Sequence, residues 1–142
     1  MNKETGSIDV TDKVPSVEAY LRLRREGGLS PFSPEAAEIG LKGTLFAVTL
    51  RQKNETIGMG RIVGDGGCFL QIVDIAVDPR FRGKGLGKKI MTVLMKWARN
   101  NVPETAFLSL LADVPADKLY AQFGFEETAP ASLGMSCRVT KS

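Results

Sequence analysis

The stretch 74–88, DIAVDPRFRGKGLGK, constrains the fold of this chain more than any other feature. An apolar run ends at Val77, a basic glycine-rich turn follows, and from Gly85 to Arg99 apolar residues recur at helical spacing. The sequence therefore predicts a strand, a turn and an amphipathic helix. The first N–H groups of a helix lack partners within it and carry partial positive charge. Because glycines let a phosphate approach the backbone, this turn is predicted to bind an anion.

Other phosphate-binding loops do not fit this spacing. A G-x-G-x-x-G loop would need glycine at Lys88, and a Walker A loop would need glycine at Arg82 and Ser or Thr at Lys89. The alternative interpretation is a plain turn with a solvated basic face. The strand before the turn and the amphipathic helix after it favour the anion site.

The rest of the chain predicts one domain, residues 1–142, that mixes helices and strands. Helical spacing, capping residues and runs of branched and aromatic residues define the other elements. In chain order they are a strand at Ser7–Thr11, a helix at Ser16–Glu26, a helix from Ser33 that ends at Gly40, strands at Leu45–Arg51, Thr56–Val63, Phe69–Val77 and Ala106–Leu111, a helix at Pro115–Gln122 and a last strand at Gly134–Thr140. The order predicts an α/β fold.

Composition excludes several classes of site. The 142 residues include no histidine, which removes imidazole as a base, nucleophile or metal ligand, so no metal is expected. The net charge is only +3, and glycines rather than stacking aromatics intersperse the basic cluster, which favours a small polyanion over nucleic acid; the cluster comprises Arg80, Arg82, Lys84, Lys88 and Lys89. No apolar run approaches the roughly 18 residues of a membrane span. Without an apolar signal region at the N-terminus, we expect a cytoplasmic protein with no membrane partner.

Two motifs resemble those of a known family. Residues 82–87, RGKGLG, resemble the motif R/Q-x-x-G-x-G/A of the GNAT superfamily of N-acetyltransferases. Residues 113–125, DVPADKLYAQFGF, resemble its second motif, N-x-x-A-x-x-L-Y followed by a Gly-Phe ending. The motifs lie in the family's order, and the resemblance covers residues 57–127. It implies a GNAT-like fold, in which helices flank a mixed, mostly antiparallel central sheet.

The resemblance also implies an activity: transfer of an acetyl group from acetyl-CoA to a primary amine by direct attack. The acceptor would be a small molecule or a peptide. The strand before the turn would carry a bulge, and its backbone would pair with the pantetheine arm of coenzyme A. Asp113 stands where the family usually has asparagine, and we expect it to cap its helix as asparagine would. The expected cofactor-binding residues are Ile75, Ala76, Val77, Arg82, Gly83, Lys84, Gly85, Leu86, Gly87, Lys88, Asp113 and Tyr120.

Two residues are candidates for catalysis. In the family, a tyrosine at the position of Tyr120 lies near the thioester sulfur and can protonate the departing thiolate; the alternative is a core aromatic. Asp74 is the one acid in the apolar run Phe69–Val77. It could bind the acceptor ammonium or accept its proton through water, or it could be a structural acid hydrogen-bonded at the bulge.

Two other functions compete with the enzyme. A non-catalytic acyl-CoA-binding module would share the loop, although Tyr120 argues against it. A nucleic-acid-binding domain would use the basic cluster. Arg22, Arg24 and Arg25 are predicted to lie on a solvated face of the first helix. Strands at the position of Gly134–Thr140 often pair between subunits in the family, which would give a homodimer.

Overall fold

The computed structural model describes residues 6–141, whose contacts divide into two compact units. The first ends at Leu110 and contains a sheet covered by helices, and the second begins at Leu111 and contains the short helix α4 (Asp117–Ala121). The expectation of a single domain stays a prediction. No helix among the described residues is long and apolar enough to cross a membrane.

Five strands form the sheet of the first unit, in the spatial order β1-β2-β3-β4-β5. Their bounds are β1 Asp9–Thr11, β2 Phe46–Gln52, β3 Glu55–Gly64, β4 Phe69–Val77 and β5 Phe107–Ser109. The pairs from β1 to β4 are antiparallel, and β4 pairs with β5 in parallel. The mixed, mostly antiparallel sheet predicted from the sequence is therefore confirmed. β4 has its predicted bounds, whereas β5 is shorter than the predicted Ala106–Leu111.

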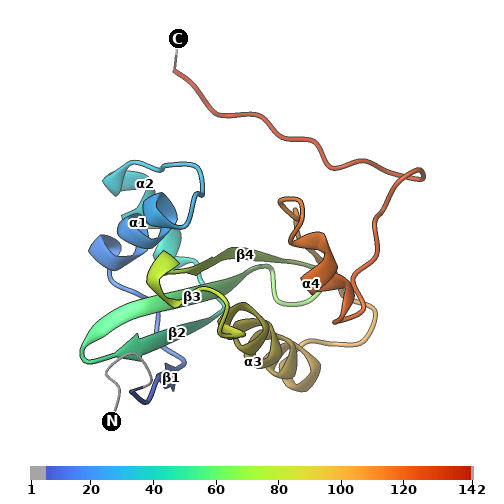
Figure 1. Cartoon of the computed structure of the whole chain (residues 1–142). Coiled ribbons are helices and arrows are strands. Elements are labelled where there is room, and N and C mark those ends of the chain that lie inside the picture. Colours follow the sequence, from blue (N-terminus) through green and yellow to red (C-terminus); the bar gives the residue numbers. More distant parts are fainter. Residues whose placement is uncertain (1–5, 142) are drawn as a thin grey trace. The chain divides into compact units, whose positions relative to one another are not determined.

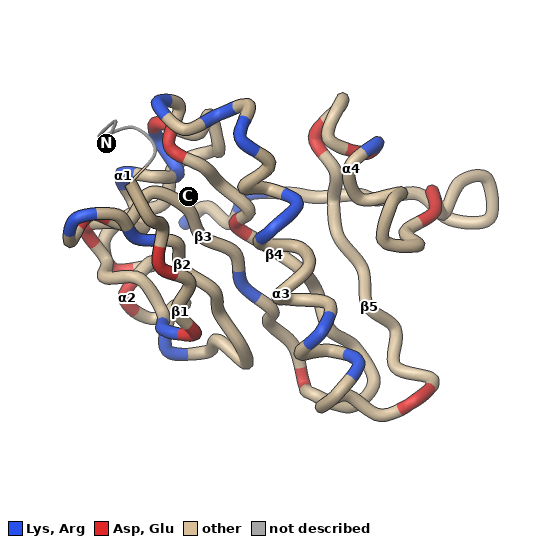
Figure 2. Tube along the Cα trace, turned by 60° about the horizontal axis from the view of Figure 1, so that its bottom comes forward, with Lys and Arg blue, Asp and Glu red and all other residues tan. Residues whose placement is uncertain are grey.

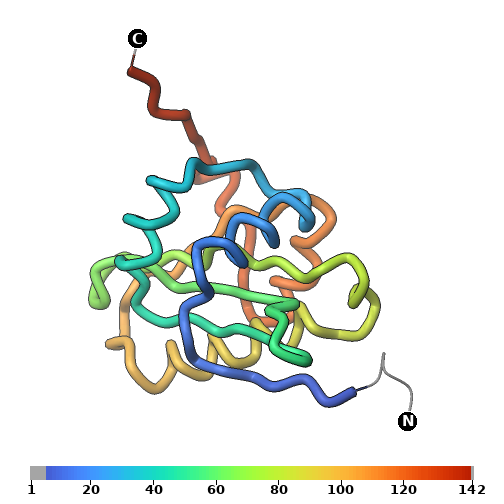
Figure 3. Tube along the Cα trace, turned by 90° about the vertical axis from the view of Figure 1, so that its left-hand side faces the viewer, coloured from blue at the N-terminus to red at the C-terminus, as the bar shows by residue number. Residues whose placement is uncertain are grey.

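Helices cover both faces of this sheet. Helices α1 (Val17–Glu26) and α2 (Pro34–Lys42) lie on one face, and α3 (Leu86–Asn101) lies on the other, as Figures 1 and 3 show. Ser16 and Ser33 cap the first two helices, since their hydroxyl groups accept hydrogen bonds from the N–H groups of the third residue beyond each. The sheet is thus the middle layer of three.

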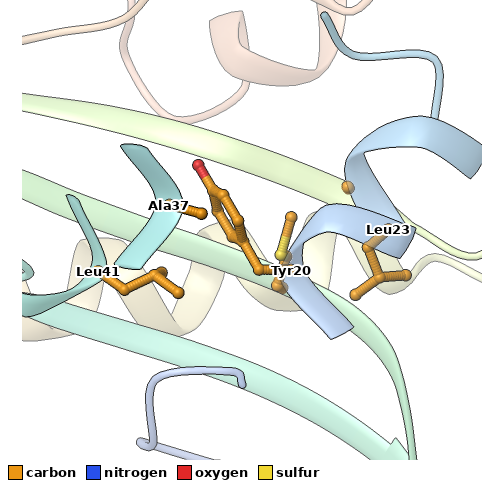
Figure 4. Packing of buried hydrophobic residues seen from close by; sticks show 6 residues of the cluster. Tyr20, Leu23, Ala37 and Leu41 are labelled. Carbon is orange, nitrogen blue, oxygen red and sulfur yellow. The ribbon is translucent and has the colours of Figure 1, made fainter. Parts of the chain in front are cut away.

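The core between α1, α2 and the sheet is built around Tyr20. Its ring lies between Leu23 of α1 and Ala37 and Leu41 of α2 (Figure 4), all of them buried. Met59 of β3 and Ala76 of β4 complete the cluster from the sheet. The apolar spacing that predicted α1 therefore also predicted the face that it buries.

On the other face, α3 packs closely on glycine positions of β3. A Cβ atom at Gly60 would lie 2.6 Å from Ile90 Cγ2, 2.8 Å from Ile75 Cδ1 and 3.1 Å from Leu94 Cδ1. The first two distances are shorter than real Cβ contacts, so the helix reaches this close only because position 60 has no side chain. Farther along α3, the rings of Trp97 and Phe46 stack with centroids 5.0 Å apart.

The bounds of two predicted helices and the last predicted strand also need correction. Helix α2 does not end at Gly40 but continues to Lys42, because Leu41 is buried in the core and Gly43 N–H closes the helix on the carbonyl of Gly40. Helix α4 spans only Asp117–Ala121 instead of Pro115–Gln122. The predicted last strand, Gly134–Thr140, is absent from the described residues: this segment pairs with no other strand there, and alternation alone makes no ladder.

Two alanine substitutions should have opposite effects on stability. Gly60→Ala should lower the free energy of unfolding by about 1–3 kcal/mol, since the methyl group collides with Ile75 and Ile90. Gly40→Ala is the matched control: it adds the same methyl group on an exposed helical position with nothing within 4 Å. It should raise the free energy of unfolding by about 0.5–1 kcal/mol. Urea unfolding of both variants measures the two signs, and a Gly60→Ala protein as stable as the parent would contradict the packing described here.

Candidate active site

The glycine-rich turn between β4 and α3 exposes the start of that helix. Gly83 and Gly85 adopt the left-handed region, with φ of 79° and 74°, and space is open around both where a side chain would be. Gly85 is the N-cap of α3, makes no side-chain cap, and no acidic residue lies in the first helical turn. Lys88 and Lys89, in the first turn of α3, are exposed, and Figure 2 shows basic residues along this turn and helix. This is the geometry of an anion site.

Asp78 anchors the beginning of the turn. Its side chain is only 2% exposed and caps the short 3-10 helix η2 (Pro79–Phe81) by accepting from Arg80 N–H at 2.9 Å. The side chain of Arg80 donates to both carboxylate oxygens, and Arg22 of α1 donates from 3.3 Å. These hydrogen bonds hold the pKa of Asp78 below its usual value, with that from the Arg80 side chain the largest cause. The turn is therefore tied to α1.

β4 carries the bulge that the resemblance implied. Met59 pairs with Ala76 and Arg61 pairs with Val73, so Asp74 and Ile75 both lie opposite Gly60. Asp74 takes a left-handed φ of 63°, which is uncommon for a residue with a side chain. Among the described strands, β5 pairs with β4 only at residues 69–71. From Ile72 onward, β4 has a strand partner on the β3 side alone.

The carboxylate of Asp74 is buried and surrounded by donors. Its side chain is 3% exposed. Arg61 Nε donates to Oδ2 at 2.7 Å, while Arg24 and the Tyr20 hydroxyl, the latter at 3.0 Å, donate to Oδ1. Burial and the negative charge of Asp74 raise the pKa of Tyr20, so its hydroxyl stays protonated and remains a donor. We call these four residues the Asp74 cluster.

The partners of Asp74 differ from what the sequence predicted. Arg24 was expected on a solvated face, but it is buried: it donates to the carbonyl of Ser30 and lies 4.3 Å from the ring of Phe32. A signal was present, since Arg24 stands four residues after Tyr20 and shares its helix face. Arg61 is likewise the one charged residue in the apolar run of β3. Opposite charges in two neighbouring apolar strands therefore predict that Arg61 and Asp74 form a pair.

The second unit contains Tyr120 and Asp113. Tyr120 lies on α4 and is half-buried; burial and, after it, the charge of Asp113 raise the pKa of its hydroxyl. The expected cap is not formed by the Asp113 side chain: the N-cap of α4 is Ala116, and it is the backbone carbonyl of Asp113 that accepts from Ala116 N–H at 2.7 Å. The aspartate in place of asparagine therefore acts on Tyr120 through its charge.

Comparison with known proteins identifies the family. Residues 17–125 match the model of the family described as "Acetyltransferase (GNAT) family". The chain belongs to the GNAT family of acetyltransferases. A probable acetyltransferase of unknown function from meticillin-resistant Staphylococcus aureus is 48% identical in sequence, with a TM-score of 0.90 over 94% of this chain and 100% of that one.

More distant GNAT relatives extend the comparison. The uncharacterized N-acetyltransferase ycf52 of Porphyra purpurea is 31% identical over 102 residues, 69% of this chain and 58% of that protein. This chain therefore spans little more than half the length of that relative. The glucosamine-6-phosphate N-acetyltransferase of Arabidopsis thaliana is similar in fold, with a TM-score of 0.67 at 18% identity over 94% of this chain and 99% of that one. GNAT enzymes generally use acetyl-CoA and acetylate small-molecule or protein amines.

The depressed pKa of Asp78 predicts an acid-sensitive contribution to stability. A carboxylate whose pKa falls on folding stabilises the protein at any pH above its ordinary pKa of 3.8. This contribution is lost as the pH falls below 3.8 toward the lowered pKa of the folded state. Asp78→Asn should therefore lower the free energy of unfolding at neutral pH and make its decline on acidification shallower. Urea unfolding between about pH 7 and pH 3 measures both effects. Asp12→Asn, at an exposed position, is the control; an equal change in both variants would refute the role of Asp78.

Proposed function

We propose that this GNAT protein is an N-acetyltransferase that moves an acetyl group from acetyl-CoA to a primary amine by direct attack of the amine on the thioester. The uncapped N-terminus of α3 behind two left-handed glycines carries the proposal. Backbone donors and a helix dipole at that position suit the pyrophosphate of coenzyme A. No metal is needed for this chemistry.

The donor would contact two stretches of backbone. The pyrophosphate would bind the turn formed by Arg82, Gly83, Lys84, Gly85, Leu86, Gly87 and Lys88. The pantetheine arm would pair with Ile75, Ala76 and Val77 as an added strand, which the missing β5 partner along this half of β4 supports. The family resemblance also assigns Asp113 and Tyr120 of the second motif to donor binding, and this assignment stays a prediction.

Tyr120 is the proposed proton donor to the departing thiolate. Its raised pKa keeps the hydroxyl protonated at neutral pH, the state from which a proton can be given. Asp74 had two candidate roles, and its contacts support the structural one. A base must have room to receive a proton from the substrate, whereas both oxygens of Asp74 are engaged by buried arginines and a phenol.

The acceptor belongs to the small-molecule or peptide amines. The net charge of +3 disfavours nucleic acid as a partner, and so does the burial of Phe81, the aromatic residue of the basic turn, which leaves its ring unavailable for stacking on bases. A cytoplasmic location and a homodimer stay predictions. Incubation of the protein and acetyl-CoA with a panel of amino acids, amino sugars, polyamines and peptides, read by release of the coenzyme A thiol, tests the function. Binding of acetyl-CoA without release by any amine would favour a non-catalytic module.

Charge at position 85 should decide whether the glycine turn binds the donor. Gly85→Glu and Gly85→Gln impose the same strain at a φ of 74° and have nearly the same size, but only glutamate adds a negative charge. We expect glutamate to abolish coenzyme A binding measured by calorimetry, whereas glutamine should retain more of the affinity. Circular dichroism controls for folding. Equal affinities in the two variants would place the pyrophosphate elsewhere.

Tyr120→Phe separates proton donation from packing. The substitution keeps the ring and removes the hydroxyl, so acetyl-CoA affinity should be almost unchanged. If the hydroxyl protonates the thiolate, kcat should fall by a factor on the order of 100. If it only bonds to a neighbour, turnover should persist while stability falls by about 1 kcal/mol. Steady-state kinetics and the thermal midpoint of this variant distinguish the two; full turnover would remove Tyr120 from the mechanism.

A further inference from the structure

The bulge decides which face of the sheet Asp74 occupies. Ile72 pairs with Ile62, and Ile62 shares a face with Gly60, whose Cβ direction meets Ile90 and Leu94 of α3. Side chains alternate along a regular strand, so an unbulged β4 would direct Asp74 to the same apolar face as Ile72. The extra residue reverses this: Asp74 contacts Tyr20 and Arg24 of α1 instead.

The partners of Asp74 are themselves anchored on other elements. Arg24 donates to the carbonyl of Ser30 at 2.9 Å and 2.6 Å. Arg61 donates to the carbonyl of Gly40 in α2 at 3.1 Å and to the Thr44 hydroxyl at 2.7 Å. Oδ1 is therefore held from α1 and Oδ2 from β3, through an arginine that is itself bonded to α2. A shift of one residue in the pairing of β4 with β3 would therefore break all of these contacts.

A buried ion pair of this kind is a poor source of net stability, because the cost of desolvating the charges offsets most of their attraction. What it does enforce is geometry. The next residues on β4 are Ile75, Ala76 and Val77, which lie in the part of the strand, from Ile72 onward, that β5 does not pair. Their backbone direction depends on where the bulge lies.

We propose that the Asp74 cluster is a positioning device for the acyl donor. The cluster holds the β4 bulge in the register that presents the backbone of Ile75–Val77 to the pantetheine arm, a role that rests on the proposed function. Tyr20, Arg24, Arg61 and Asp74 act through that backbone, and none of them touches the donor in this role. The glycine turn binds the pyrophosphate independently of the cluster.

Two ligands separate this role from a purely structural one. Coenzyme A contacts both the turn and β4, whereas 3′-phospho-ADP has the pyrophosphate but lacks pantetheine. Arg61→Met breaks the bond to Oδ2 and leaves Asp74 with Arg24 and Tyr20. In calorimetry the Kd for coenzyme A should rise about tenfold, the loss expected for one or two hydrogen bonds, while the Kd for 3′-phospho-ADP stays the same. Tyr20→Phe, a milder change, should raise only the Kd for coenzyme A, by about threefold.

Arg51→Met is the matched control. Arg51 also bridges backbone segments, donating to Thr56 Oγ1 at 2.8 Å and to the Asn54 carbonyl, but it lies at the turn between β2 and β3. Its removal should lower the thermal midpoint and change neither Kd. The proposal is overturned if both ligands weaken by the same factor in the cluster variants, or if the midpoint falls with coenzyme A affinity intact. If Arg61→Met does not fold, Tyr20→Phe decides the question by the same two comparisons: the Kd of variant and parent for coenzyme A, and the Kd of variant and parent for 3′-phospho-ADP. A parent protein that binds neither ligand would instead refute the donor site itself.

Discussion

The buried carboxylate of Asp74 is the interaction on which the first unit of this protein depends. It lies within a β-bulge at a left-handed φ of 63° and meets guanidinium groups from α1 and β3. Removing one member of a buried ion pair leaves a charge without compensation, at a typical cost of about 3–5 kcal/mol. The bulge and the placement of α1 and α2 on the sheet therefore require one another. Neither is a local property of its own segment.

Both stretches that we assign to the donor offer backbone rather than side chains. At the turn, left-handed glycines and an uncapped helix expose N–H groups; on β4, the end of the β5 ladder exposes a strand edge. Backbone N–H and C=O groups cannot be replaced by mutation, but their orientation changes when the side chains that fix the backbone conformation are substituted. Asp78 and Asp74 therefore have related roles, since each is a buried acid whose arginine partners fix the backbone beside a segment that we assign to the donor. The first lies before the turn, the second within the strand.

Much of the fold followed from local sequence patterns. β4 has its predicted bounds, α3 begins directly after Gly85, and the bulge was implied by the family resemblance. Errors arose where a pattern has two outcomes. Glycine commonly ends helices, but at Gly40 the burial of Leu41 outweighs the low helix propensity of glycine. The segment Gly134–Thr140 alternates like a strand, yet a strand exists only with a partner, and the described residues supply none.

By itself the sequence determined the glycine turn and the helix that follows it, because glycine content and helical spacing are short-range properties, and its two motifs indicated the family. Which charges meet was decided only by the tertiary structure. Asp74 stands 50 residues after Arg24 and 13 after Arg61, and no local rule pairs them. Their contact requires a one-residue shift in strand register, and that shift is favourable only when α1 already covers the sheet. A buried charge needs an opposite charge close to it in space, and only the tertiary structure determines which residue supplies that charge.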